Sequence, residues 1–351
     1  MTEHTLVVGI DVGDKYSYLH VLDNASGDEV EQTRIATNPE AYRRKFKGYD
    51  LSRSILEVGC QSGWISRLLL ELGHSVLVAD PRKARLLMGR EHKDDKTDAE
   101  LLARIGRLDP KLLKPVTLRS EQTQSALSVL RSRDVLVRAR TQLINHVRGT
   151  LKTLGRKLPK TSSYLFHKLR SELPTLLKPA LEPVMSALES ITEQIDELEQ
   201  EIERMCEQDY PQAQKFREIP GVGPVTALTY VLTIESPERF RNSRQVGAYL
   251  GLIRRRWMSG DDDPALHITK SGDAMLRRLL VNCAQHILGP FGHDSDLRRW
   301  GLKYAETGGK LAKRRAVVAV ARRLAVLMHR LWTTGQDYEP LYNAQQAELA
   351  K

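Results

Sequence analysis

The first third of the chain alternates short apolar runs with polar turns. Apolar runs predict strands at residues 5–12, 17–23, 30–36, 54–58 and 75–79, with Gly, Asp and Asn between them. Helical spacing predicts helices at residues 39–47, 63–72, 81–88 and 98–108, the first capped by Asn38. The order β-β-β-α-β-α-β-α predicts a ribonuclease H-like α/β domain, in which three antiparallel strands precede parallel strands joined by helices.

The next segment has helical spacing with few turn signals. Residues 118–178 predict long basic helices, interrupted at Pro159 and Pro174. From Leu181 to Met205 the apolar positions are separated by 3, 4, 3, 4, 3, 4 and 3 residues. This is the a/d seam of a coiled-coil hairpin or dimer, although an ordinary bundle helix would show similar spacing.

The last part of the chain is predicted to be mostly helical. Strong helical patterns fall at residues 226–235, 274–288 and 310–332, and the last of them is amphipathic and rich in arginine. We therefore expect an α/β domain at residues 1–110 and a segment of basic helices with a coiled coil at residues 111–209. A mostly α C-terminal domain should follow at residues 210–340, and a tail at residues 341–351.

Charge is unevenly distributed along the 351 residues. The chain carries 54 Lys and Arg against 44 Asp and Glu, yet residues 111–178 alone carry 15 basic and three acidic side chains. Residues 182–209 reverse this balance, with ten acids and one base. The basic stretch predicts a polyphosphate partner, although a solvated helical surface is the alternative. Its candidate nucleic-acid-binding residues are Arg131, Arg133, Arg138, Arg140, Arg148 and Lys152.

Cysteine usage and hydropathy predict a cytoplasmic protein in a reducing cytosol. The three cysteines form no CxxC pair, which argues against a disulfide framework or a zinc ribbon. No apolar run approaches the roughly 20 residues that a bilayer requires, and the N-terminus lacks a signal-peptide pattern. We expect no membrane partner.

Four carboxylates form the first candidate site. Asp11 lies inside an apolar strand, where a charge is costly unless it is paired or bound to metal, and Glu57 ends the fourth strand. Asp95 and Asp98, in HKDDKTDAELLA, are three residues apart at the start of a helix, with Asp94 as an alternative to Asp95. Hard oxygen ligands from three elements predict a Mg²⁺ site, with two ions suited to phosphoryl displacement.

A second set of motifs lies in the C-terminal part. IPGVGPVTA contains Gly221 and Gly223 before a helix, as in helix-hairpin-helix modules that bind a phosphate at a helix N-terminus; a plain helix joint is the alternative. Downstream, Ser259 lies among cations that could stabilise charge on a phosphoryl group, although it could equally be a turn residue. The neighbouring cations are Arg254, Arg255, Arg256, Lys270, Arg277 and Arg278.

Taken together, these motifs resemble a known family. GIDVG, LEVGCQSGW and the HKDDKTDA stretch, followed by PGVGPVTA, GAYLGL and ITKSGDAMLRRLL, are similar to insertion-sequence transposases of the one-ten, one-sixteen and nine-hundred-two family. The resemblance spans roughly residues 5–335. It implies a RuvC-like domain with a D-E-D-D metal site at Asp11, Glu57, Asp95 and Asp98, a catalytic Ser259, and coiled-coil helices between the two domains.

The resemblance also implies partners and a mechanism. Members of this family are bridge-RNA-guided DNA recombinases that pair a structured RNA with double-stranded target and donor DNA. They assemble as dimers that pair into a tetramer, so that the serine of one protomer meets the acids of another. Ser259 would attack a phosphodiester to give a phosphoserine, with Mg²⁺ at the acids. One departure is that Asp261, Asp262 and Asp263 follow Ser259-Gly260, where many members carry glycines and a basic residue.

Two other readings of the sequence remain open. A RuvC-like junction nuclease would use only the acids and water, and its hydrolytic nicking would survive Ser259→Ala. An actin-like sugar kinase is suggested by GIDVGDKYS, but the chain shows no second phosphate motif, and a net charge of +10 is unusual for such an enzyme.

Overall fold

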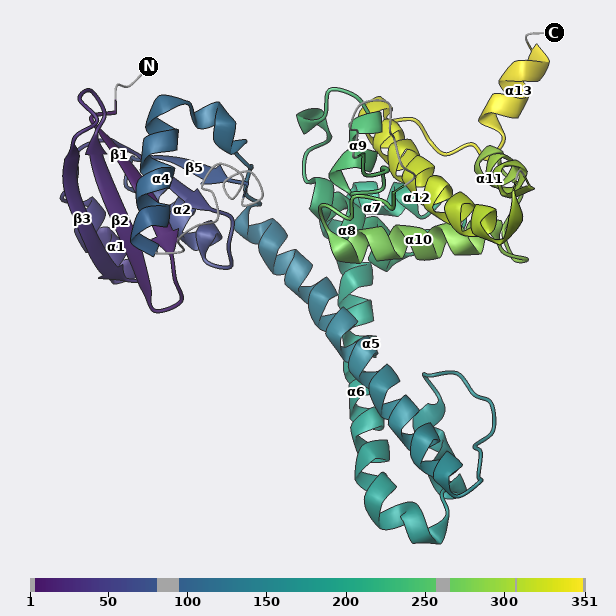
Figure 1. The fold of residues 1–351 in the computed structure, drawn as a ribbon. Coiled ribbons are helices and arrows are strands. Elements are labelled where there is room, and N and C mark those ends of the chain that lie inside the picture. Colours follow the sequence, from purple (N-terminus) through teal and green to yellow (C-terminus); the bar gives the residue numbers. More distant parts are fainter. Residues whose placement is uncertain (1–3, 81–94, 257–265, 307, 350–351) are drawn as a thin grey trace. The chain divides into compact units, whose positions relative to one another are not determined.

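The computed structural model describes residues 4–80, 95–256, 266–306 and 308–349. By its internal contacts the chain divides into two compact units, Met1–Glu121 and Gln122–Lys351 (Figure 1). The four-part division expected from the sequence is finer than this one and remains a prediction.

The first unit is built on one mixed sheet. Its strands are β1 (Leu6–Val12), β2 (Tyr16–Asp23), β3 (Glu29–Ala36), β4 (Ser52–Glu57) and β5 (Ser75–Ala79). The strand order is β3-β2-β1-β4-β5, in which β1, β2 and β3 pair antiparallel and β1, β4 and β5 pair parallel. The helices are α1 (Pro39–Phe46), α2 (Ser62–Glu71) and α4 (Asp95–Leu108). The α/β class and the five strands are confirmed, whereas the helix predicted at 81–88 lies outside the described residues.

The two faces of this sheet carry different helices. Successive side chains of a strand point to opposite faces, so Val8 and Ile10 of β1 join the core under α1 and α2, while Val7 joins a second core under α4. A Cβ added at Gly9 would lie 1.9 Å from the carbonyl oxygen of Ala99. The absence of a side chain at Gly9 therefore lets α4 pack directly on the backbone of β1.

A long helical hairpin opens the second unit, with α5 (Glu121–Thr153) and α6 (Lys178–Arg204) running antiparallel (Figure 1). The apolar seam predicted for α6 is partly buried within the chain itself, where Leu181 and Leu188 share a core cluster with Ile144 and Val147 of α5. Of the long helices predicted over residues 118–178, α5 is confirmed, but the prediction was wrong for the residues between α5 and α6. Helix α5 ends before Gly155, which has a left-handed φ of 67°, and only short 3-10 helices follow, at Phe166–Glu172 and Thr175–Leu177.

The rest of the second unit is helical. Its helices are α7 (Pro211–Phe216), α8 (Pro224–Ile234), α9 (Arg244–Tyr249), α10 (Ala274–Leu288), α11 (Asp296–Glu306), α12 (Gly309–Thr334) and α13 (Tyr342–Leu349), so the three helices predicted here are present as α8, α10 and α12. Helix α8 is central, because residues 226–234 are all buried. The hydroxyl of Tyr230 donates to the carbonyl oxygen of Ala325 at 2.7 Å, which joins α8 to α12. No described helix is long and apolar enough to cross a membrane.

Candidate functional site

Two of the predicted acids lie at the carboxyl ends of neighbouring parallel strands. Asp11 follows Ile10, and Ile10 is paired with Leu56, the residue before Glu57. Because side chains alternate along a strand, Asp11 points to the same face as Gly9, which is the face covered by α4. Both carboxylates are half-buried. The register of β1 and β4 therefore brings these two acids together below α4.

The direction of α4 decides where the other two acids lie. At its C-terminal end, Arg107 Nε donates to the carbonyl oxygen of Asn24 at 3.0 Å, beside the start of β1. The N-terminal half contacts Gly9 through Ala99, farther along β1. Helix α4 thus runs antiparallel to β1, and its first turn lies toward the carboxyl ends of β1 and β4. That turn carries Asp95, which is exposed, and Asp98, which is half-buried.

We call the four carboxylates the acidic edge, which consists of Asp11, Glu57, Asp95 and Asp98. Asp94, the alternative ligand, lies outside the described residues. Among the residues that are described, no three His, Cys, Asp or Glu side chains are close enough together to hold a metal ion. The donor set nevertheless suits a hard divalent cation, because it consists only of carboxylate oxygens from a sheet edge and a helix start. The backbone brings these groups to one edge without forming a closed cage.

Ser259 lies outside the described residues, but the chain on both sides of it is well defined. Arg254 pairs with Ile268 in an isolated antiparallel bridge. On either side of this bridge, the Arg255 amide donates to the carbonyl oxygen of His267 and the Thr269 amide to that of Ile253, both at 2.9 Å. Backbone pairing therefore joins residues 253–255 to residues 267–269, the described chain on the two sides of the predicted nucleophile. Arg254, Arg255 and Arg256 are all exposed.

Two glycines allow a close approach of the backbone next to these paired residues. Gly251 and Gly272 have left-handed φ values of 66° and 70°, and added Cβ atoms would lie 2.3 Å from the Ser271 amide nitrogen and 2.1 Å from the Tyr249 carbonyl oxygen. Asp273 then caps α10 by accepting from the Leu276 amide at 2.9 Å. The ITKSGD motif is thus a turn followed by a helix cap. Its exposed Lys270 also has a left-handed φ, of 55°.

The predicted helix-hairpin-helix turn joins α7 to α8. Gly221 has a left-handed φ of 91°, and a Cβ there would lie 2.8 Å from the ring of His286 on α10. Gly223 is the N-cap of α8, and a Cβ at that position would meet nothing within 4 Å. Gly221 is thus required by packing within the domain, whereas Gly223 leaves the start of α8 open.

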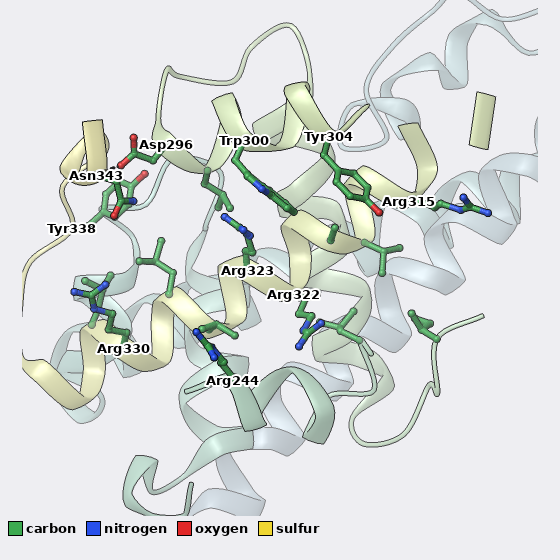
Figure 2. A pocket seen from close by; sticks show the side chains of 18 of the residues that line it. Arg244, Asp296, Trp300, Tyr304, Arg315, Arg322, Arg323, Arg330, Tyr338 and Asn343 are labelled. Carbon is green, nitrogen blue, oxygen red and sulfur yellow. Dashed lines mark hydrogen bonds between the residues drawn. The ribbon is translucent and has the colours of Figure 1, made fainter. Parts of the chain in front are cut away.

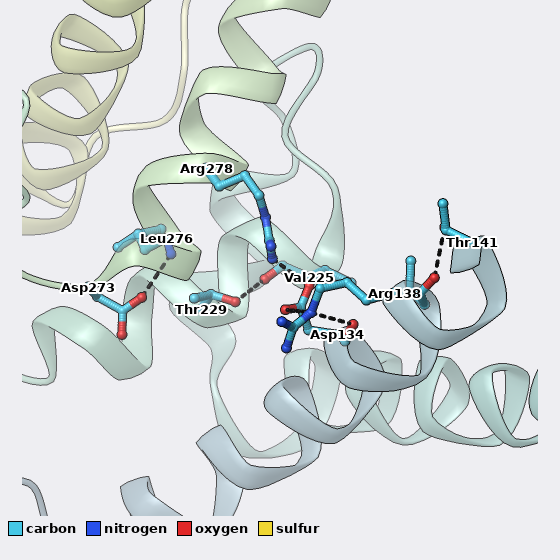
Figure 3. A network of polar contacts seen from close by, with 9 residues as sticks. Asp134, Arg138, Thr141, Val225, Thr229, Asp273, Leu276 and Arg278 are labelled. Atoms are coloured by element: carbon cyan, nitrogen blue, oxygen red, sulfur yellow. Dashed lines mark hydrogen bonds and ion pairs between the residues drawn. The ribbon is translucent and has the colours of Figure 1, made fainter. Parts of the chain in front are cut away.

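Several predicted nucleic-acid contacts have partners inside the protein. Arg133 pairs with Glu199 of α6, and Arg138 and Arg278 both pair with Asp134, which links α5 to α10 (Figure 3). Two other predicted cations also have defined contacts. Arg148 lies 5.2 Å over the ring of Phe166, and Arg277 donates to the carbonyl oxygens of Leu250 and Ser271 at 3.1 and 2.7 Å. Exposed Arg131 and Lys152 and half-buried Arg140 complete the predicted set on α5.

One large groove was not revealed by the sequence. It is a groove of about 1730 Å³ in the second unit, bounded by α9, α11, α12 and the described chain on both sides of Ser259 (Figure 2). Its basic residues are Arg244, Arg254, Lys270, Arg314, Arg315, Arg322, Arg323 and Arg330, and its acids are Asp296, Asp337 and Glu339. We call it the arginine groove. The arginine content of α12 was the available signal, but only the fold shows that these arginines face one cavity.

Comparisons with known proteins agree with this organisation. Residues 213–296 match the family described as Transposase IS116/IS110/IS902, and residues 8–155 match a DEDD transposase family. A Pseudomonas aeruginosa protein named as a probable family 20 transposase is 30% identical over 344 residues, covering 95% of this chain and 98% of its own. The Coxiella burnetii transposase for insertion sequence element IS1111A is 28% identical, covering 85% and 84%. The chain therefore belongs to the IS110/IS116/IS902 family of insertion-sequence transposases.

Proposed function

We propose that this transposase cuts and exchanges DNA strands through a covalent phosphoserine at Ser259, with divalent metal ions at the acidic edge and a structured RNA as guide. The packing of α4 on Gly9 is the observation that carries the metal part of this proposal, because it brings Asp98 to the same edge as Asp11 and Glu57. The strand order, with three antiparallel strands followed by two parallel ones, supports a ribonuclease H-like assignment for the same domain.

The chemistry assigns a role to each group. The Ser259 oxygen attacks the phosphorus of a DNA phosphodiester, the bond from phosphorus to one DNA oxygen breaks, and that oxygen leaves as a hydroxyl with the proton that the serine gives up. A hydroxyl on the exchanged strand later attacks the phosphoserine and restores the serine. Mg²⁺ bound at the acidic edge would supply positive charge at the phosphoryl oxygens. The arginines before Ser259 would add to that charge.

A guide RNA accounts for how such an enzyme chooses its DNA. Base pairing would supply the sequence choice, and the protein would supply charge and shape. Dimers that pair into a tetramer would bring the serine of one protomer to the acids of another. The exposed cations of α5, such as Arg131 and Lys152, are available for phosphate contacts.

The first test is to express the protein with its native flanking DNA and to sequence the RNA that copurifies with it. A single abundant structured RNA from the flank, with loops matching the element's ends, supports guidance and provides substrates for a strand-exchange assay. Heterogeneous RNA, or none, contradicts guidance.

Variants then test the chemistry. Asp11→Ala and Ser259→Ala should both abolish strand exchange, and only proteins that retain Ser259 should give a DNA adduct that survives denaturation. Asp14→Ala is the matched control, because Asp14 is an exposed acid three residues from Asp11. Full strand exchange by either of the first two variants would contradict the mechanism. Hydrolytic nicking that persists in Ser259→Ala would favour a RuvC-like nuclease.

A further inference from the structure

The arginine groove contains positive charge that the protein does not neutralise. Within the described part of the chain, none of the five arginines that α12 contributes to the groove forms a salt bridge with a carboxylate. Arginines elsewhere in the same unit do have such partners, among them Arg204, Arg217 and Arg299. Of the three acids in the groove, Asp337 pairs with Lys215. Asp296 accepts a hydrogen bond from the backbone amide of Asn343 at 2.6 Å. The groove is therefore suited to an anionic ligand.

Aromatic rings line the same groove. Trp300 and Tyr304 of α11 stack with ring centroids 5.5 Å apart and planes 27° apart, and the Arg323 guanidinium lies 3.5 Å over Trp300 (Figure 2). Tyr304 exposes 41% of its surface. Arg330 similarly lies 5.7 Å over the ring of Tyr342. Nucleic-acid bases stack on flat rings and guanidinium planes of this kind, and neighbouring arginines without a carboxylate partner can bind the phosphates.

We propose that the arginine groove binds single-stranded nucleic acid, with phosphates on the α12 arginines and an unpaired base stacked at Tyr304. A duplex has its base faces covered and would leave the aromatic part of the groove unused. The described chain on both sides of Ser259 lines one side of this groove through Arg254 and Ile268. A strand bound there would therefore pass beside the backbone pairing that flanks the proposed nucleophile.

The inference rests on the protein's action on nucleic acid, but not on the chemistry of Ser259 or on metal. Binding is therefore measured with Ser259→Ala protein in EDTA, so that failure of the strand-transfer mechanism leaves this test intact. The probes are fluorescent oligomers of deoxythymidine and of uridine, each about 12 nucleotides long and so within the usual site sizes, and a DNA duplex of the same length. Fluorescence anisotropy across a salt series gives affinity and salt slope.

The ring variants report stacking. Tyr304→Ala should weaken binding of single strands by about 5- to 150-fold, the loss expected when one stacked base loses its platform. Tyr304→Phe keeps the ring and should bind like the parent protein, which separates stacking from misfolding. Duplex affinity should be equal in all three proteins. Equal losses for duplex and single strand, or no loss in Tyr304→Ala, would overturn the proposal.

The charge variants report phosphate contacts. Arg322→Gln should lower the magnitude of the single-strand salt slope by about 0.7, the change expected when one phosphate contact is lost. Lys313→Gln is the matched control, because Lys313 is an exposed cation on α12 that does not line the groove. Equal slopes for these two variants would overturn the proposal, as would equally effective competition by polyglutamate. Tighter binding of the uridine oligomer would identify the strand as RNA, and tighter binding of the deoxythymidine oligomer as DNA.

Discussion

Replacement of Gly9 by alanine tests both the packing of the first unit and the acidic edge. The added Cβ would lie 1.9 Å from the Ala99 carbonyl oxygen and 2.6 Å from the Ala103 amide nitrogen, and both of these are backbone atoms that cannot rotate away. To restore an ordinary 3.4 Å contact, α4 would have to withdraw by about 1.5 Å. Such overpacking costs about 1–3 kcal/mol of unfolding free energy. Because the withdrawn helix carries Asp98, the acids would also move apart.

Hydrogen exchange measured by mass spectrometry can resolve this local effect in the full chain. Amides of α4 should exchange about 5- to 150-fold faster in Gly9→Ala, which corresponds to the loss of 1–3 kcal/mol. Strand exchange should fall by about 100-fold, because a displacement near 1 Å can cost that much in catalysis. Gly48→Ala is the control, since its added Cβ would meet its nearest atom, the Lys45 carbonyl oxygen, at 3.4 Å.

Two results would refute the reasoning. If the amides of α4 exchange as slowly in Gly9→Ala as in Gly48→Ala, then α4 does not pack on β1 as described. If α4 is loosened but strand exchange is unchanged, then Asp98 does not act together with Asp11, and the acidic edge has no common catalytic role.

Three further predictions concern stability and reactivity. Asp134→Asn should lower the unfolding free energy of the second unit by only about 1 kcal/mol in thermal unfolding, because its ion pair with Arg278 is partly exposed. A double-mutant cycle with Arg278→Gln should show that the two residues are coupled. Additive effects would contradict an ion pair between α5 and α10. Burial lowers the pKa of His74 below 6.5, so the unfolded chain binds the extra proton and stability should fall as pH drops below about 6.5. His74→Gln should flatten that dependence in denaturant titrations at several pH values, and an unchanged slope would exclude this histidine as its cause. Iodoacetamide should label exposed Cys60 in the native protein but not Cys206, because burial raises the pKa of the Cys206 thiol to about 11. Equal labelling rates, measured by mass spectrometry, would show that Cys206 is accessible.

The sheet could be predicted from sequence because its signals are local. Apolar runs bounded by turns located all five strands to within two residues, and β5 was placed at its observed bounds. Helix α4 was expected to begin at residue 98 but begins at Asp95, because the first turn, DKT, is polar and adds nothing to an apolar pattern. The adjacency of Asp11 and Glu57 followed from the order of elements, and the register of β1 and β4 agrees with it.

The partners of charged residues were not predictable in the same way. Residues 111–178 have the largest positive charge in the sequence, but some of this charge is paired with distant acids. Arg133 pairs with Glu199, which is 66 residues away, and Asp134 pairs with Arg278, which is 144 residues away. Spacing along one helix cannot reveal pairings over such separations. For the same reason, the stacking of Arg323 of α12 on Trp300 of α11 appears only in the folded chain.

The spacing of the five α12 arginines in the groove keeps the repulsion between them small. They fall at three levels, at residues 314–315, 322–323 and 330, so that successive levels are separated by seven or eight residues. With a rise of about 1.5 Å per residue, the levels lie about 10–12 Å apart, beyond the screening length of about 8 Å at physiological salt. The like-charge pairs three or four residues apart that destabilise helices are absent among these five. Repulsion therefore costs the fold little, while the row extends about 24 Å along one wall of the groove. Charges that served only solubility would not have to face a cavity lined with aromatic rings. The position of these arginines is therefore the reason that we propose a strand of nucleic acid in the groove.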